Sequence, residues 1–454
     1  MQQREQSKPF FSVRQKGLSK QIVSEISDRK NEPGWMTDFR LFSLEMFYKL
    51  KVPTWGPDIS ALDFDDLFYY VQPVNEKKRT WEDVPENIKK TFDRIGVPQA
   101  EKEMLAGLGA QFDSEIIYKN IKKQYSDKGV IFCSMDDGVR LHPQIVKKYF
   151  ASVVSQSEHK LAALNSAVWS GGSFVYVPCG VEIDQPLQTY FRIEAEQFGQ
   201  FERTLIIAEK GSKFHYVEGC SAPVYRAHSL HSAVVEIVAM ENSSIKYSTI
   251  QNWTSNVYNL VTKRAFVYKN ATMQWVDGNF GSKVTMKYPC MVLKEQGARG
   301  EVVSISVAKE GQHQDSGAKI IHLGADTSSH VISKSICKDG GRVSYRGLVS
   351  VAKGATGARS KVQCDSLILD ECSRSDTYPK IDVKEQKACV EHEAFVSKIN
   401  EEKLEYLMLN GINEQAARSL VVNGFLEPFI CELPDEYAVE ISRLIDLEME
   451  GSVG

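Results

Sequence analysis

The stretch that decides the fold contains the runs VVSISVA (Val302–Ala308), KIIHL (Lys319–Leu323), VSYRGLVSV (Val343–Val351) and VQCDSLIL (Val362–Leu369). These runs are rich in Val, Ile and Tyr and alternate in the manner of β-strands. Similar runs recur from about Ser157 to Ile399, and this stretch has no convincing window of helical periodicity. The sequence therefore predicts a mainly β fold.

Turn residues separate these runs at a regular spacing. The successive gaps are 32, 28, 26, 14, 14, 15, 14 and 16 residues between the turns at Gly211, Ser243, Ala271, Gly297, Gly311, Ala325, Gly340, Gly354 and Asp370. A unit of 14 to 16 residues thus occurs both singly and doubled. A fixed period of this kind indicates a coiled or stacked β architecture.

Two architectures can produce this period. A meander of antiparallel hairpins would place Asn-Gly or Asp-Gly between its strands, and only Asp277-Gly278 and Asp339-Gly340 fit well. In a parallel β-helix each strand stacks on the strand one coil earlier, so the turns need not be tight. The β-helix is the favoured architecture.

Length and composition limit the class of protein. A chain of 454 residues has room for two or three domains. Its 55 basic and 59 acidic residues give a net charge of −4 without a basic stripe, which argues against a nucleic-acid surface. No apolar window is long enough to cross a bilayer, so we expect a cytoplasmic protein, although a mature plastid form would look the same. Nine widely spaced cysteines, an odd number, favour reduced thiols.

The chain divides into three predicted parts: a mixed, mainly helical N-terminal domain (1–155), a β-helix core (156–398) and a C-terminal helical domain (399–454). The helices predicted in the flanking parts include 36–50, 112–126, two short helices within 81–106, 401–409, one from Asn413 to the Asn423-Gly424 break, and a last one from Pro434 to Glu450. The C-terminal helices carry more apolar surface than fifty residues can bury, so part of it is expected to contact a partner.

Common catalytic signatures are absent. The sequence has no GxxxxGK[ST] loop, no GxSxG elbow, no GxGxxG fingerprint, no HExxH and no CxxC. An NTPase, hydrolase or dehydrogenase of a familiar type is therefore not expected.

The candidate metal ligands lie late in the β core. Cys364 is in a predicted strand, and Glu391, His392 and Glu393 follow 27 residues later. Thiolate, imidazole and carboxylate together suit iron or zinc. Side chains alternate along a strand, so the two glutamates should face one side and His392 the other. The spacing alone matches no recognised metal motif.

Cys220 is a second candidate. It is predicted to lie in an exposed turn after a strand, where Lys213 or His215 could favour its thiolate. The alternative is an inert buried cysteine, because free cysteines are commonly buried. Ordinary packing or surface positions are expected for the cysteines at 133, 179, 290, 337, 372, 389 and 431, and ordinary hydrogen bonding for the histidines at 228, 231, 313, 322 and 330.

Several segments together resemble the SufB/SufD family of the SUF iron-sulfur cluster assembly system, and its SufB-type scaffold subunits in particular. The resemblance runs nearly from end to end and is carried by KNEPGWM (30–36), PTWGPD (53–58), GAQFDSE (109–115), FERTLI (201–206), EGCSAP (218–223), GARS (357–360), QCDS (363–366), EHEA (391–394) and EGSVG (450–454).

The resemblance implies a right-handed parallel β-helix flanked by helical domains. It also implies a non-catalytic scaffold in a complex with a SufD-like relative, or a second copy of the chain, and the ATPase SufC. The C-terminal helices would bind SufC, and ATP hydrolysis would belong to SufC. Sulfur would arrive as persulfide from a cysteine desulfurase and its sulfur-transfer partner.

The resemblance also implies roles for individual residues. Cys220 would accept sulfur, and Cys364 would hold a nascent, transient iron-sulfur cluster with Glu391, His392 and Glu393 as further ligand candidates. The positions implied to line a sulfur path are Arg192, Gln251, Trp253 and Lys263. A reduced flavin is an implied electron source in the complex, although the sequence has no flavin fingerprint.

Two departures and two alternatives accompany this hypothesis. An N-terminal CxxCxxxC cluster of some relatives is absent, and Glu194 stands where some relatives have Asn, which puts the detail of the sulfur path in doubt. The chain could instead be the SufD-like structural subunit, against which Cys220 and the Glu-His-Glu segment argue. An independent β-helix enzyme such as a polysaccharide lyase would require a carboxylate cluster in an open groove.

Overall fold

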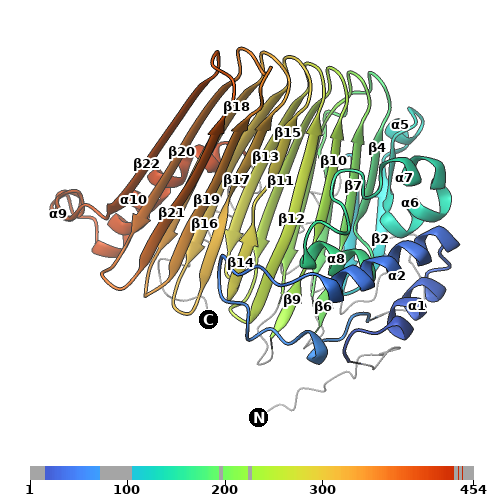
Figure 1. The fold of residues 1–454 in the computed structure, drawn as a ribbon. Coiled ribbons are helices and arrows are strands. Elements are labelled where there is room, and N and C mark those ends of the chain that lie inside the picture. Colours follow the sequence, from blue (N-terminus) through green and yellow to red (C-terminus); the bar gives the residue numbers. More distant parts are fainter. Residues whose placement is uncertain are drawn as a thin grey trace, which may run out of the picture.

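The chain forms a β-solenoid of two facing sheets with helices at its ends (Figure 1). The computed structural model describes residues 16–71, 105–193, 198–222 and 228–433, together with Ala438 and Ser442. One sheet has ten strands in the order β2-β1-β5-β8-β11-β13-β16-β18-β20-β22. The other has twelve, with the main path β21-β19-β17-β14-β12-β10-β7-β4-β3 and β6, β9 and β15 beside it.

Successive strands alternate between the two sheets, and neighbours within the solenoid pair in parallel. From β16 (Arg299–Ala308) onward they are β17 (His313–His322), β18 (Ser328–Cys337), β19 (Arg342–Val351), β20 (Arg359–Ile368), β21 (Arg374–Val383) and β22 (Cys389–Lys398). Parallel pairing contradicts the hairpin meander and confirms a solenoid, which has about 7 turns. The predicted right-handedness stays a prediction.

The earlier strands follow the same pattern with more interruptions. They are β1 (Gly107–Phe112), β2 (Glu115–Ile121), β3 (Ile131–Ser134), β4 (Ser173–Val177), β5 (Leu187–Arg192), β6 (Gly199–Gln200), β7 (Arg203–Ala208), β8 (Lys213–Ser221), β9 (Ser229–His231), β10 (Val234–Ala239), β11 (Ser244–Asn252), β12 (Val257–Val267), β13 (Thr272–Phe280), β14 (Val284–Lys287) and β15 (Cys290–Leu293). Only the pairs β1–β2 and β3–β4 at the start of the solenoid are antiparallel among the described strands.

The predicted turn positions are confirmed. Gly311, Gly340 and Gly354 have φ angles of 73°, 83° and 93°. Side chains rarely adopt this left-handed conformation, so glycine is the residue that turns the chain from one sheet to the other at least cost. One such turn per strand explains the 14 to 16 residue unit, and two strands complete one coil.

Stacked side chains fill the narrow core between the sheets. One register line through the ten-stranded sheet joins Leu187, Tyr216, Tyr247, Trp275, Val302, Val331 and Val362. These residues belong to one buried cluster with Val235, Ala265, Met291 and Ile320 of the opposite sheet. Because each coil repeats the register of the last, like residues stack and little apolar area stays in water.

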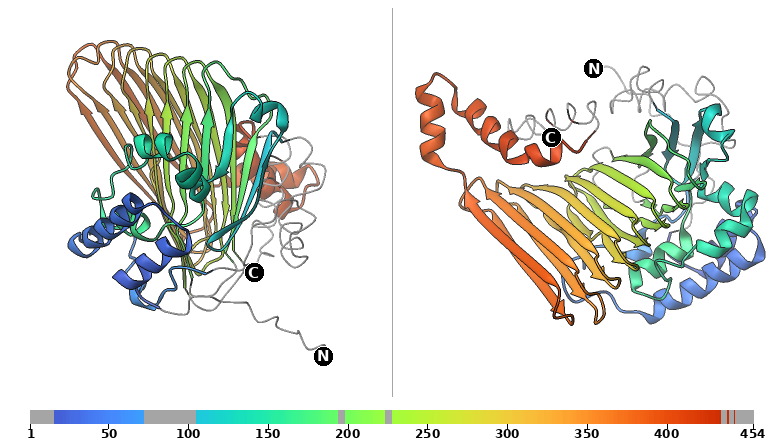
Figure 2. Two further views of the ribbon diagram at one scale, coloured as in Figure 1. Left: turned by 90° about the vertical axis from the view of Figure 1, so that its right-hand side faces the viewer. Right: turned by 90° about the horizontal axis from the view of Figure 1, so that it is seen from above.

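The N-terminal helices cover the outer face of the twelve-stranded sheet (Figure 2). They are α1 (Lys20–Arg29), α2 (Gly34–Lys49), α6 (Met135–Leu141), α7 (Pro143–Tyr149) and α8 (Lys160–Val168), with the 3-10 helix η1 (Phe64–Asp66). The short α5 (Lys123–Ser126) instead contributes Tyr125 to the core between the sheets. The helix predicted for 112–126 was wrong, because Glu115–Ile121 of that segment form strand β2, which pairs with β1, and only Lys123–Ser126 are helical. Helix α8 lies within the stretch from Ser157 to Ile399, in which the sequence showed no helical periodicity. The expectation that this stretch contains no helix was therefore wrong. The helices predicted within 81–106 lie almost wholly outside the described residues.

The C-terminal helices are α9 (Glu401–Leu409), as predicted, and α10 (Glu414–Ile430). The predicted stop at Asn423-Gly424 was wrong, because α10 continues through Pro428. Its buried residues Val422, Leu426 and Phe429 pack against the outer face of the ten-stranded sheet, which holds the helix together past the glycine. The predicted helix 434–450 lies outside the described residues except for Ala438 and Ser442, and the three-part division of the chain stays a prediction.

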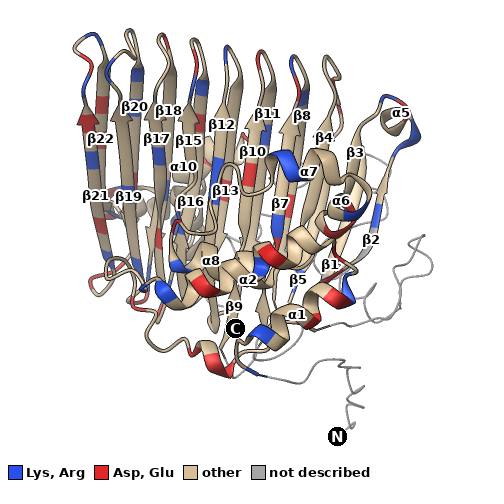
Figure 3. Cartoon of the chain, turned by 45° about the vertical axis from the view of Figure 1, so that its right-hand side comes forward, with Lys and Arg blue, Asp and Glu red and all other residues tan. Residues whose placement is uncertain are grey.

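Charged residues of both signs are interspersed over the helices and strand ends (Figure 3). No helix of the described part of the chain is long and apolar enough to cross a membrane.

Candidate functional site

A buried column of polar side chains runs along the inner face of the ten-stranded sheet. The register stacks its members one coil above another: Thr189, Glu218, Thr249, Asp277, Ser304, Ser333 and Cys364. Each of them is less than 9% exposed. We call this set the polar column. Polar groups are costly to bury, so a line of them through an otherwise apolar core requires a compensating network or a function.

Cys220 lies beside the start of the polar column, two residues after Glu218 on the same face of β8. It is 4% exposed and belongs to a strand, so the predicted exposed turn was wrong. Lys213 and His215 do not favour its thiolate. Burial instead raises the pKa of the Cys220 thiol well above its ordinary value, and the nearby Glu218 and Glu202 raise it further. The thiol donates to Glu218 Oε1 over 3.8 Å.

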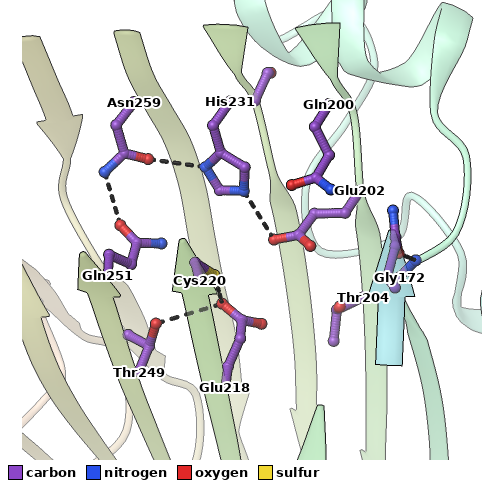
Figure 4. A network of polar contacts seen from close by, with 12 residues as sticks. Gly172, Gln200, Glu202, Thr204, Glu218, Cys220, His231, Thr249, Gln251 and Asn259 are labelled. Atoms are coloured by element: carbon purple, nitrogen blue, oxygen red, sulfur yellow. Dashed lines mark hydrogen bonds and ion pairs between the residues drawn. The ribbon is translucent and has the colours of Figure 1, made fainter. Parts of the chain in front are cut away.

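Glu202 and His231 from the opposite sheet face Cys220 (Figure 4). One ligand atom from each of these three side chains lies within 4.8 Å of the other two. All three residues are buried, and His231 Nε2 is 3.2 Å from Glu202 Oε1. Burial raises the pKa of Glu202 to about 8 and lowers that of His231 to about 4. We call these residues the Cys-His-Glu cluster.

A hydrogen-bonded chain supports this cluster. Asn259 Oδ1 lies 2.9 Å from His231 Nδ1, and Asn259 Nδ2 donates to Gln251 Oε1 over 2.7 Å. Lys287 Nζ donates to the same Gln251 oxygen over 3.3 Å. Lys287 is in turn 3.3 Å from Asp277 Oδ1 in the polar column.

The four residues of the expected sulfur path occupy different places. Gln251 contacts the Cys-His-Glu cluster through Asn259, and Lys263 Nζ is 3.4 Å from Asp277 Oδ1. The Trp253 ring lies 4.6 Å from that of His231. Arg192 follows Phe191 on β5 and so points to the opposite face from Cys220, where it donates to Ser221 Oγ over 3.2 Å. Glu194 lies outside the described residues.

Cys364 meets His392 at the other end of the polar column. Their Sγ and Nε2 atoms are 3.4 Å apart, and burial together with Asp365 raises the pKa of the Cys364 thiol to about 11. Glu391 and Glu393 are exposed on the other face of β22. The alternation predicted from sequence is thus confirmed: the strand brings His392 to Cys364 and turns both glutamates away.

The remaining cysteines and histidines show no comparable grouping among the described residues. None of the nine cysteines forms a disulfide; Cys290 and Cys337 are buried, and Cys179, Cys372, Cys389 and Cys431 are exposed. His313 and His322 have hydrogen-bond partners in Ser344 and Thr327. These residues fit the ordinary positions expected for them.

Sequence reasoning missed Glu202, Glu218 and His231 as site residues. His231 was expected to be ordinary, and the glutamates were noticed only inside segments that carry the family resemblance. Cys220 lies on β8 of the ten-stranded sheet, whereas Glu202 directly precedes β7 of the other sheet, so only the coil register brings them together. No local sequence signal could have identified the cluster.

The fold and site thus define a β-solenoid with two buried cysteines joined by an internal polar column. The SUF system FeS cluster assembly, SufBD core domain family model matches residues 191–425, and the SufBD protein N-terminal region model matches 30–189. The chain belongs to the SufBD family of iron-sulfur cluster assembly proteins.

Curated relatives match nearly the whole chain. An iron-sulfur cluster assembly SufBD family protein of Staphylococcus aureus is 57% identical over 440 residues, which are 97% of this chain and 95% of the relative. A Staphylococcus epidermidis protein of the same description is 56% identical over the same shares. This level of identity does not separate the SufB branch from the SufD branch.

Proposed function

We propose that the chain is a SufB-type scaffold that accepts persulfide sulfur at Cys220 and helps to build a nascent iron-sulfur cluster at Cys364. It would be no enzyme itself, and SufC would hydrolyse ATP. The observation that carries this proposal is the polar column. It leads from beside Cys220 to Cys364 over five strand spacings, about 24 Å at ~4.8 Å each.

Sulfur loading needs a thiolate at Cys220. Glu218 Oε1, 3.8 Å from Sγ, is placed to take the thiol proton. The sulfur of Cys220 then attacks the outer sulfur of the donor persulfide, and the donor leaves as a thiolate that regains a proton. The products are a Cys220 persulfide and the donor thiol, with no net oxidation or reduction.

Transfer to Cys364 cannot be direct, because the two thiols are several coils apart and no other cysteine lies in the polar column. Release of sulfide from the persulfide consumes two electrons and one proton and restores the Cys220 thiol. A reduced flavin in the complex is the expected source of those electrons. The hydroxyl, amide and ammonium groups along the inner faces would solvate a hydrosulfide ion on its way.

The nascent cluster is cargo at the Cys364 end. Cys364 and His392 offer a thiolate and an imidazole, which suit iron. Glu391 and Glu393 face outward, away from Cys364. They would bind the cluster only if a second chain placed it on their side of β22 or if a bulge in the strand turned them inward. The edges of β21 and β22 have no further strand among the described residues, so a SufD-like relative or a second copy could pair there.

The proposed SufC surface is on the C-terminal helices. Tyr406, Leu409 and Leu420 are 68%, 87% and 53% exposed, although other residues of α10 pack on the solenoid and Leu404 of α9 packs with Ala417 of α10. Large apolar side chains grouped on an exposed surface are typical of a protein interface.

The test is sulfur transfer from a cysteine desulfurase and its sulfur-transfer partner under anaerobic conditions, read by mass spectrometry of peptides. We expect one added sulfur on Cys220, lost in Cys220→Ser and retained in Cys364→Ser and in the control Cys431→Ser. Subsequent iron addition should give a cluster absorption that Cys364→Ser loses. Sulfur on the exposed cysteines but not on Cys220 would refute the acceptor role.

The SufD-like alternative makes the opposite prediction for the same measurement. A structural subunit would gain no sulfur at Cys220 although it is folded and assembled with its partners. It would then support cluster assembly only together with a separate SufB chain.

A further inference from the structure

The hydrogen-bonded chain behind the Cys-His-Glu cluster determines which ring nitrogen of His231 carries a proton. A lysine can only donate hydrogen bonds, so the side-chain oxygen of Gln251, and not its nitrogen, must face Lys287. Asn259 Nδ2 donates to that oxygen, which turns Asn259 Oδ1 toward His231 Nδ1. His231 therefore donates from Nδ1 and presents the lone pair of Nε2 to Glu202.

This arrangement is the one that a metal-binding histidine needs. Histidine ligands usually donate their second ring nitrogen to an oxygen acceptor, which fixes the tautomer and the orientation of the ring. In the absence of a cation, Nε2 and an ionised Glu202 carboxylate would be two acceptors 3.2 Å apart, so Glu202 must hold a proton between them.

Glu202 also has a free coordination position. Its Oε2 atom is buried and has no hydrogen-bond partner within the described residues. Glu218 differs, because Tyr247 and Thr249 both donate to it. Of the two glutamates, Glu202 is therefore the one with an unpartnered carboxylate oxygen.

The buried ion pairs of this region lie elsewhere. Lys263 and Lys287 both pair with Asp277, so neither Glu202 nor Glu218 forms an ion pair with a lysine among the described residues. A divalent ion bound by the Glu202 carboxylate and the Cys220 thiolate would neutralise the negative charges of these two groups. Charges in a protein interior are stable only when they are paired or bound to a metal.

We propose that Cys220, His231 and Glu202 form a binding site for one divalent metal ion of the zinc and ferrous iron class. A thiolate, an imidazole and a carboxylate suit these ions, and three protein ligands leave a fourth position open for an exogenous group. Tetrahedral ligands at about 2.0 to 2.1 Å from zinc lie about 3.3 Å apart, close to the 3.2 Å between His231 Nε2 and Glu202 Oε1. The proposal goes beyond sulfur acceptance and does not depend on it.

The test is titration of the chelator-treated full chain with Co²⁺ under anaerobic conditions, read as the thiolate-to-cobalt charge-transfer absorption. The chain carries Cys364→Ser, so that the thiol beside His392 cannot contribute. We expect one equivalent of Co²⁺ to bind with this absorption. Competition with Zn²⁺ and with Fe²⁺ then ranks the natural candidates.

Variants in the same background assign the ligands. Cys220→Ser should abolish the charge-transfer absorption, and His231→Gln and Glu202→Gln should each weaken Co²⁺ binding by about 10- to 100-fold or more. Asn259→Leu, which removes the acceptor for His231 Nδ1, should weaken it about 10- to 100-fold. The control His215→Gln changes a histidine of β8 that faces away from the cluster and bonds to Ser248 instead. It should leave the affinity unchanged.

Two results would overturn the metal site: a folded Cys364→Ser chain that binds no Co²⁺ with thiolate absorption, or an absorption that survives Cys220→Ser. Glu202→Gln keeps the side-chain size and can still donate to His231, so it tests the site even if His231→Gln fails to fold. Sulfur loading of Cys220 in the metal-free chain is measured separately. Failure of the metal site can therefore be distinguished from failure of the sulfur-acceptor function.

Discussion

Asp277 holds two buried lysines at the centre of the polar column. Burial alone would raise the pKa of its carboxyl, but the charges of Lys263 and Lys287 outweigh burial and hold that pKa below its ordinary value. Asp277→Asn would leave two buried ammonium groups without an anion. We expect a loss of about 3 to 5 kcal/mol in the free energy of unfolding, measured with urea.

The matched control is Asp382→Asn. Asp382 pairs with Lys384 over 3.4 Å at the surface, where both side chains are largely in water. The same chemical change should cost less than about 1 kcal/mol there. Equal losses for the two variants would show that the charge of Asp277 is not needed inside the solenoid.

Asp370 gives a prediction about pH. Its carboxylate accepts from the backbone N–H groups of Cys372 and Ser373 over 2.8 and 2.7 Å, and from Ser373 Oγ over 2.8 Å. Burial alone would raise its pKa, but the hydrogen bond from the Cys372 thiol, 3.0 Å away, and these other hydrogen bonds together lower it from 3.8 to about 2. A carboxyl with a lowered folded-state pKa stabilises the fold above its unfolded-state pKa, and this contribution is lost as the pH falls through about 2.

The corresponding variant is Asp370→Asn, which keeps the side-chain shape. We expect it to lower the free energy of unfolding by about 1 kcal/mol near neutral pH. Urea titrations at about pH 6 and about pH 3 should show the difference from the wild type shrinking at the lower pH. A difference that stays constant between the two pH values would contradict a role for the carboxylate charge.

At the scale of the element, α10 is attached to the solenoid by one apolar face. Phe429 is fully buried, and a Cβ atom at Gly278 of β13 would lie only 3.1 Å from its ring, so this glycine makes room for the helix. Phe429→Ala should cost about 3 to 5 kcal/mol in unfolding free energy. The control Leu420→Ala, on the same helix but 53% exposed, should change stability by less than about 0.5 kcal/mol. Similar losses for both would mean that α10 is not docked in this way.

The strands and turns were predictable from sequence because the physics that produces them is local. Gly311, Gly340 and Gly354 show the turns directly, and the alternating runs between them show the strands. The helix expected at 112–126 was wrong because pairing with β1 overrides local preference. The continuation of α10 past Gly424 was missed because packing on the sheet stabilises it.

The site was less predictable than the fold. The alternation rule placed His392 on the opposite face from Glu391 and Glu393 correctly, because it needs only neighbours in sequence. Cys220 was misplaced in a turn, and its contact with Glu202 and His231 depends on register between distant coils. Such contacts form only when the coils stack, so neighbouring residues in the sequence do not predict them.

At the scale of the whole molecule, the two cysteines occupy contrasting positions. Cys220 lies deep within the solenoid, covered by both sheets. Cys364 is two strands from the end of the chain's β region and pairs through β20 with the last strand, β22. The polar column thus leads from an enclosed site toward the last strands of the solenoid, where a second protein would have access. This arrangement, with one cysteine enclosed and the other near the last strands, suits a scaffold that takes in one reactant and completes its product at an interface.

The end of the solenoid gives the last prediction. Strands β21 and β22 each pair on one side only among the described residues, and they expose Ile381, Phe395 and Val396 at 48%, 61% and 54%. An unpaired edge with apolar side chains favours pairing with another chain, and a lysine on such an edge opposes it. We therefore expect Phe395→Lys and Ile381→Lys each to weaken association with a SufD-like partner or a second copy at least tenfold, measured by sedimentation velocity. Leu409→Lys on α9 introduces the same charge away from the edge and should leave that association unchanged. If Leu409→Lys weakened it and the strand variants did not, the partner would bind at the C-terminal helices and not at the end of the solenoid.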